Sequence, residues 1–223
     1  MWDEEPSWPL AREVRDGVMR TAGSLANAGA HVEQAKPDID GGELMDFYTA
    51  LLTPIVALDM PDAMIASFEK MRDGDRKIML AGGKDAASAA FRYRASAPFR
   101  ELAAAQITRE AGKYSLAKFF QRYDAIVMPI DMVTAFPHQH EPSFAERLLE
   151  VDGTIVPYPN ILNWISLATA LHAPALVVQA GQTAREMPVG VQIVGPWNGE
   201  DRLFDFAAAV EEGLGGFRPP PGL

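Results

Sequence analysis

Two kinds of side chain in this sequence could support chemistry: a carboxylate after a buried strand and a pair of closely spaced histidines. Asp131 follows the run Tyr123–Pro129, whose consecutive apolar residues predict a strand buried on both faces. The carboxyl ends of strands face ligand crevices in α/β folds, so Asp131 is a candidate site residue, although an aspartate that caps a loop fits the same position. His138 and His140 have the spacing that would place both imidazoles on one face of a strand. A metal site needs a third ligand, and the polar edge of a loop is the simpler interpretation of this pair.

Nucleophilic catalysis has less support from the residues alone. The sequence contains no cysteine, which excludes thiolate nucleophiles, disulfides and cysteine-bound zinc. None of the eight serines lies in a glycine-rich turn of the G-x-S-x-G type. A weak alternative is an independent hydrolase that uses Asp131 with His138 or His140. We expect neither a metal nor a cofactor, and we expect His172, which lies in an apolar run, to be a hydrogen-bonded histidine of the core.

The composition predicts a folded protein with an acidic balance. The 223 residues are 48% hydrophobic and 22% charged, which is ordinary for a globular chain that can bury a core. The 30 acidic against 20 basic residues give a net charge of -10, which argues against nucleic acid or an anionic membrane surface as a partner. No apolar signal segment is visible at the N-terminus, and prolines interrupt the uncharged stretch 153–184, which is therefore expected to be buried core. These features favour a cytoplasmic protein.

The pattern of apolar residues predicts a single α/β domain over residues 1–223. Apolar spacing and punctuation by glycine and proline predict helices over about 9–28, 42–58, 61–72, 98–122, 160–171 and 200–213. Strands are predicted over 31–35, 123–129, 174–180 and 189–194. The elements between 42 and 122 would form a helical layer with few strands. A polar turn is expected at 72–76, a long irregular connection at 131–160 and a proline-rich tail at 217–223.

Three runs of the sequence resemble one known family. Pro174–Gly181 resembles the P-A-x-x-V-P-A-G strand of the amidase signature family, and Met187–Pro196 resembles its L-P-V-G-x-Q-I-V-G-P strand. Tyr123–Pro129 resembles the Y-D-x-x-x-x-P strand of the same family. The similarity spans residues 1 to about 215, and 42–122 is its least distinctive part. It implies the C-terminal half of that family's mixed β-sheet core, flanked by helices.

The resemblance also implies an activity. Family members hydrolyse carboxylic amide C–N bonds through a serine acyl-enzyme. Their Ser–Ser–Lys triad lies in a glycine- and serine-rich signature that nothing in this sequence matches, so no catalytic residue is assigned here. By resemblance, the substrate pocket would be lined by the loop after the Tyr123–Pro129 strand and by one helix face, namely by Ile130, Asp131, Met132, Phe136 and Trp164. Simple core packing explains Phe136 and Trp164 at least as well.

Two interpretations of function remain open at this point. The chain is the C-terminal portion of an amidase, inactive alone, which acts on a small-molecule amide once an N-terminal half completes it. Alternatively, it is a noncatalytic, truncated amidase-like protein that self-associates or serves only as a structural partner. The second interpretation rests on the strand edges and apolar faces that a divided sheet exposes, which favour homo-oligomers.

Overall fold

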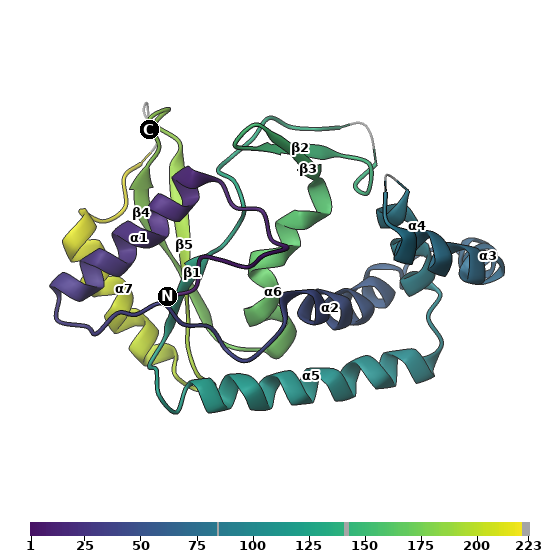
Figure 1. The fold of residues 1–223 in the computed structure, drawn as a ribbon, viewed down its shortest axis with the longest axis horizontal. Helices are drawn as coiled ribbons and strands as arrows, with labels where there is room; N and C mark the ends of the chain where they lie inside the picture. The colour runs from purple at the N-terminus through teal and green to yellow at the C-terminus, as the bar shows by residue number, and fades with distance from the viewer. Residues whose placement is uncertain (84, 141–142, 220–223) are drawn as a thin grey trace.

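The computed structural model describes residues 1–83, 85–140 and 143–219. Among these residues, five α-helices come first along the chain, and the strands of two small antiparallel sheets follow, with a sixth α-helix between them and a seventh after them (Figure 1). The helices are α1 (Arg12–Asn27), α2 (Gly41–Val56), α3 (Asp62–Ala81), α4 (Ala86–Ala95), α5 (Phe99–Phe119), the 3-10 turn η1 (Tyr158–Ile161), α6 (Leu162–Leu171) and α7 (Glu200–Leu214). The strands are β1 (Ile126–Pro129), β2 (Leu148–Val151), β3 (Thr154–Pro157), β4 (Ala175–Gln182) and β5 (Pro188–Val194).

The larger sheet has the order β1-β5-β4, and β5 pairs antiparallel with both neighbours. Its register places Val127 opposite Ile193, and Val178 opposite Val191. All four residues of β1 are buried, which confirms the predicted strand with two covered faces. No other described strand pairs with β4, so its outer edge carries no ladder.

Helices cover the two faces of this sheet differently (Figure 1). α1 and α7 pack together on one face, where Val18 and Val210 join Val191 in a fully buried apolar cluster. α6 lies against the other face at β1, and the buried Gln192 of β5 ties the two together. Its amide donates hydrogen bonds to the carbonyl oxygens of Pro129 (2.7 Å) and Trp164 (2.8 Å). Val177 of β4 remains 50% exposed.

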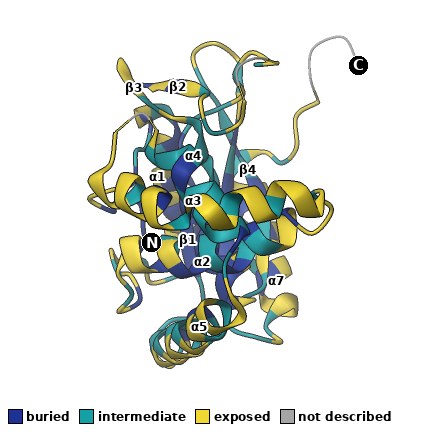
Figure 2. Cartoon of the chain, turned by 90° about the vertical axis from the view of Figure 1, so that its right-hand side faces the viewer, coloured by how far each residue is buried: buried dark blue, intermediate teal, exposed yellow. Residues whose placement is uncertain are grey.

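α2 to α5 form a helical layer beside the sheet. α2 and α5 pack on each other and on α6, while α3 and α4 form a hairpin at the outer end of the layer (Figure 1). The hairpin is joined by an ion pair in which both hydrogen bonds run from Arg92 of α4 to the buried Asp75 of α3 (3.0 and 2.5 Å). Figure 2 shows that α3 is largely exposed while the interior of the layer is buried. The hairpin therefore depends on local contacts more than on the central core.

Three expectations about local structure were wrong. Residues 31–35 are not a strand, because in the described chain only two hydrogen bonds join them to Met1: the Ala35 amide donates to the Met1 carbonyl, and the Met1 ammonium donates to the Glu33 carbonyl. Residues 72–76 are not a turn but the middle of α3, where the buried Asp75 pairs with Arg92. The connection 131–160 contains the β2–β3 hairpin and η1, with Asp152 and Gly153 in the left-handed turn between the strands.

The fold class is confirmed: this is an α/β protein of the expected type, with the strand pair 175–182 and 188–194 at its centre. Within the described residues, no helix has the length and apolar character that crossing a membrane would require.

Candidate functional site

The loop that follows β1 places Asp131 in a partly buried position beside the sheet. Its carboxylate accepts a hydrogen bond from the Met132 amide (2.6 Å). Burial raises the pKa of Asp131 to about 6, and hydrogen bonds from the backbone amides of Met132 and Val133 oppose that rise. A carboxyl group with such a pKa can exchange a proton near neutral pH, which is a property common among functional carboxylates.

Two of the predicted pocket residues lie in the apolar core of the chain. Met132 and Trp164 are fully buried. Trp164 is the centre of an aromatic cluster, with its ring centroid 5.0 Å from that of Trp8 and 6.0 Å from that of Trp2. Its indole N–H donates to the carbonyl oxygen of Pro9 (3.1 Å), so both the ring and the polar atom of the side chain have structural partners.

Phe136 and Ile130 are half-buried and lie nearer the surface. The ring of Phe136 packs edge-on against Tyr158 (5.7 Å between centroids), and Phe144 packs edge-on against the same tyrosine (5.2 Å). Ile130 lies beside Gly190 of β5, on the side of the sheet that carries Val177. The structure therefore separates the five predicted residues into a buried pair and three residues of one loop.

The histidines do not join Asp131 in a catalytic arrangement. His138 and His140 lie side by side, with 5.8 Å between ring centroids, and both are exposed. No hydrogen bond connects either ring to Asp131 within the described residues, and no group of three metal-ligating side chains is found there. The expectation for His172 was wrong: it is exposed, ends α6 in the left-handed conformation and lies 3.2 Å from the Arg109 guanidinium.

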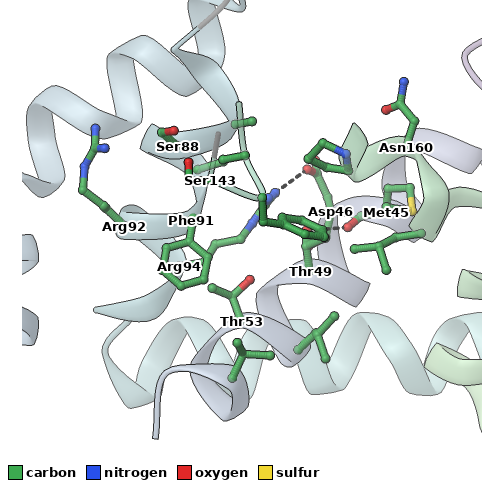
Figure 3. Close-up of a pocket in the computed structure, with 18 of the residues that line it drawn as sticks. Met45, Asp46, Thr49, Thr53, Ser88, Phe91, Arg92, Arg94, Ser143 and Asn160 are labelled. Carbon is green, nitrogen blue, oxygen red and sulfur yellow. Dashed lines mark hydrogen bonds and ion pairs between the residues drawn. The ribbon is translucent and has the colours of Figure 1, made fainter. Parts of the chain in front are cut away.

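Sequence analysis missed a cavity that opens between α2, α4, α6 and the segment 143–145. It measures about 890 Å³. Figure 3 shows side chains of α2 (Met45, Asp46, Thr49 and Thr53) facing side chains of α4 (Ser88, Phe91 and Arg94) across it. Since Phe144 lines the cavity and also packs on Tyr158, the loop that holds Phe136 is linked to the cavity through one tyrosine.

The charged groups of the cavity are neutralised by each other or by the neighbouring helix. The Arg94 guanidinium lies 2.9 Å from the Asp46 carboxylate (Figure 3), and desolvation lowers its pKa from the ordinary value. Arg92 points away from Arg94, toward its partner Asp75 on α3. The rest of the lining is apolar or carries uncharged polar groups. The cavity is thus suited to an uncharged molecule.

No serine of the described chain is paired with a lysine amine. Ser96 and Ser166, both buried, donate to backbone carbonyls of their own helices, and the Ser143 hydroxyl donates to Glu146. Among the described lysines, Lys36 and Lys113 pair with glutamates. The described residues therefore hold no serine activated by an adjacent base.

Comparison with known proteins decides the family. The Amidase family model matches residues 1–204. The chain belongs to the amidase family. The match includes all five strands of this amidase chain and begins at the segment that carries Trp2 and Trp8.

Relatives of this amidase chain are longer. A glutamyl-tRNA(Gln) amidotransferase subunit from Exiguobacterium sp. is 36% identical over 116 residues, which are 52% of this chain and 22% of the relative. The solved structure of 6-aminohexanoate cyclic dimer hydrolase complexed with substrate superimposes with a TM-score of 0.65 at 20% identity, over 96% of this chain and 44% of the other. The solved structure of a glutamyl-tRNA(Gln) amidotransferase subunit from Thermotoga maritima superimposes with a TM-score of 0.61 at 20% identity. This superposition covers 98% of this chain and 44% of the other. This chain spans less than half the length of each of these proteins.

Proposed function

We propose that residues 1–223 are the C-terminal portion of an amidase that hydrolyses carboxylic amide C–N bonds, and that the Ser–Ser–Lys triad is supplied by residues outside this chain. The observation that carries the proposal is the extent of the alignments. The superposition on 6-aminohexanoate cyclic dimer hydrolase uses 96% of this chain but fills 44% of that enzyme. The catalytic serines and lysine would then come from the portion of the enzyme that this chain does not cover.

The division of roles follows from what the chain contains. In the complete enzyme, the serine would attack the amide carbonyl and expel the amine, and water would then release the acid from the acyl-enzyme. The described part of this chain would supply strands of the sheet, the loop with Asp131 and the wall of the cavity. The outer edge of β4 and the exposed Val177 are suitable contacts for the completing half, because unpaired strand edges accept further strands.

Activity-based labelling tests the proposal. A fluorophosphonate probe, which reacts with activated serines, should leave all eight serines of the isolated chain unmodified, as read by intact mass and peptide mapping. Phenylmethanesulfonyl fluoride-sensitive trypsin serves as the positive control for the reagent. Stoichiometric labelling of any serine between residues 1 and 223 would contradict the assignment of the nucleophile to another part of the enzyme.

The second candidate is a noncatalytic protein that self-associates, and the same open edge of β4 favours it. In that case two copies would cover each other's exposed strand and Val177 face. Light scattering during size exclusion distinguishes the two candidates. A concentration-independent dimer favours the second, whereas a monomer that assembles only with an amidase N-terminal half favours the first.

A further inference from the structure

The surface of the cavity between α2, α4 and α6 is mainly apolar, and aromatic rings contribute to it. Three phenylalanines reach it from three separate segments: Phe68 from α3, Phe91 from α4 and Phe144 from the segment after residue 142. Aromatic rings bind other rings in edge-to-face or offset contacts at little entropic cost. The cavity volume of about 890 Å³ lies in the range of sites that enclose a small organic molecule.

Several polar side chains of this lining have no hydrogen-bond partner among the described residues, and Asn163 is the most buried of them. Asn163 is 5% exposed and lines the cavity. Within the described residues, the side-chain amide of Asn163 makes no hydrogen bond. Its polar atoms are still reachable from the cavity. A buried amide of this kind offers one carbonyl acceptor and two N–H donors, which complement a second amide.

The remaining charges exclude charged ligands. Arg94 is held by Asp46 and Arg92 by Asp75, so neither guanidinium is free to balance an incoming carboxylate. A ligand with an unpaired charge would lose its hydration in an apolar site without gaining a counterion.

From the phenylalanines, the free amide of Asn163 and the paired arginines, we propose that the cavity binds a neutral aryl amide, with its ring among Phe68, Phe91 and Phe144 and its amide group at Asn163. The statement that this ligand is the substrate rests on the function proposed above. The statement that the cavity binds it is independent of that function. The proposal therefore names an aryl amide as the substrate class and excludes charged amides such as free glutamine.

Titration calorimetry on the 223-residue chain tests the binding. N-(1-naphthyl)acetamide is expected to bind at least about tenfold more tightly than acetamide, because of the apolar area that its rings bury, and L-glutamine is expected not to bind. Equal affinity for the three compounds, or no binding of the naphthyl amide, would overturn the proposal.

Two substitutions locate the site. Ala90→Trp on α4 and Ala145→Trp in the loop each place a large ring in the cavity from a different wall, and each should weaken binding of N-(1-naphthyl)acetamide at least about tenfold. Ala66→Trp on the exposed surface of α3 is the matched control and should leave the dissociation constant unchanged. Because Ala145 lies in a loop, Ala145→Trp can test the cavity even when Ala90→Trp fails to fold. If a folded variant binds N-(1-naphthyl)acetamide with an unchanged dissociation constant, the ligand binds elsewhere and the proposal is wrong.

The two proposals fail in different ways. If the aryl amide does not bind but the chain restores hydrolysis when combined with an amidase N-terminal half, the substrate class is wrong and the proposed function holds. If the aryl amide binds in the cavity and no such combination is active, the site is correct and the proposed function is wrong.

Discussion

At the scale of single residues, Asp131 has the clearest pH dependence. The pKa of its carboxyl group is about 6 in the folded chain, against about 3.9 in an unfolded one. As the pH rises from 4 to 6, the unfolded state releases this proton before the folded state does, so the folded state loses stability in that window. Above pH 6 the loss is complete and constant.

Asp131→Asn should remove this dependence. An asparagine cannot ionise and its side-chain oxygen can still accept the Met132 amide, so the variant should gain about 2 kcal/mol in free energy of unfolding at pH 7.5. The gain should approach zero at pH 4. Urea titrations at the two pH values measure it, and the exposed Asp59→Asn is the control. If the variant is destabilised equally at both pH values, the Asp131 side chain stabilises the fold through its hydrogen bond, and burial of its charge does not lower stability.

Sequence analysis could predict the position of Asp131 but not the cavity. The carboxylate follows an unmistakable buried strand, so its place at a strand end was predictable. The cavity is assembled from residues far apart in the chain. One signal was available: α2 has a core face with Leu44 and Phe47 and a second face with Met45, Thr49 and Thr53. A helix that needs cover on two faces indicates a second apolar environment.

At the scale of elements, α1 packs on β5 through a glycine. A Cβ atom at Gly17 would lie 2.6 Å from the Val189 Cγ1 atom, which is too close for two carbon atoms. Gly17→Ala should therefore lower the free energy of unfolding by about 1 to 3 kcal/mol, because helix and sheet must separate.

Gly23 in the same helix provides the matched control. Nothing lies within 4 Å of a Cβ atom at this position. Gly23→Ala should raise stability by up to about 1 kcal/mol through helix propensity alone. Thermal or urea unfolding compares the two variants, and equal effects would show that α1 does not approach the sheet this closely.

The elements that the sequence predicted correctly are those with strong local signals. The strands at 175–182 and 188–194 and the helix at 200–214 have clear apolar patterns and punctuation. The errors arose where tertiary contacts decide. Arg72–Arg76 looks like a polar turn, yet Asp75 is paired with Arg92 of the next helix, and this pairing favours continuation of α3. The segment 31–35 has strand-like residues but no neighbouring strand among the described residues to pair with.

At the scale of the whole molecule, the central feature is a three-stranded sheet whose outer strands, β1 and β4, pair with no further described strand. A sheet of this size usually needs further cover for an exposed apolar residue such as Val177. The resemblance in the sequence predicted the family, and the family match over residues 1–204 confirms it. The contacts of the outer edge of β4 could not be predicted from the sequence, because no described strand of this chain pairs with it.

Ammonia release from a primary aryl amide such as 1-naphthamide tests the central claim most directly. It is measured for the 223-residue chain alone, for an amidase N-terminal half encoded upstream of it alone, and for the two together. The account predicts hydrolysis only in the mixture, with loss of activity when the signature serine of the added half is replaced by alanine. Hydrolysis by the isolated chain, or an upstream sequence without a glycine- and serine-rich signature in any frame, would contradict it.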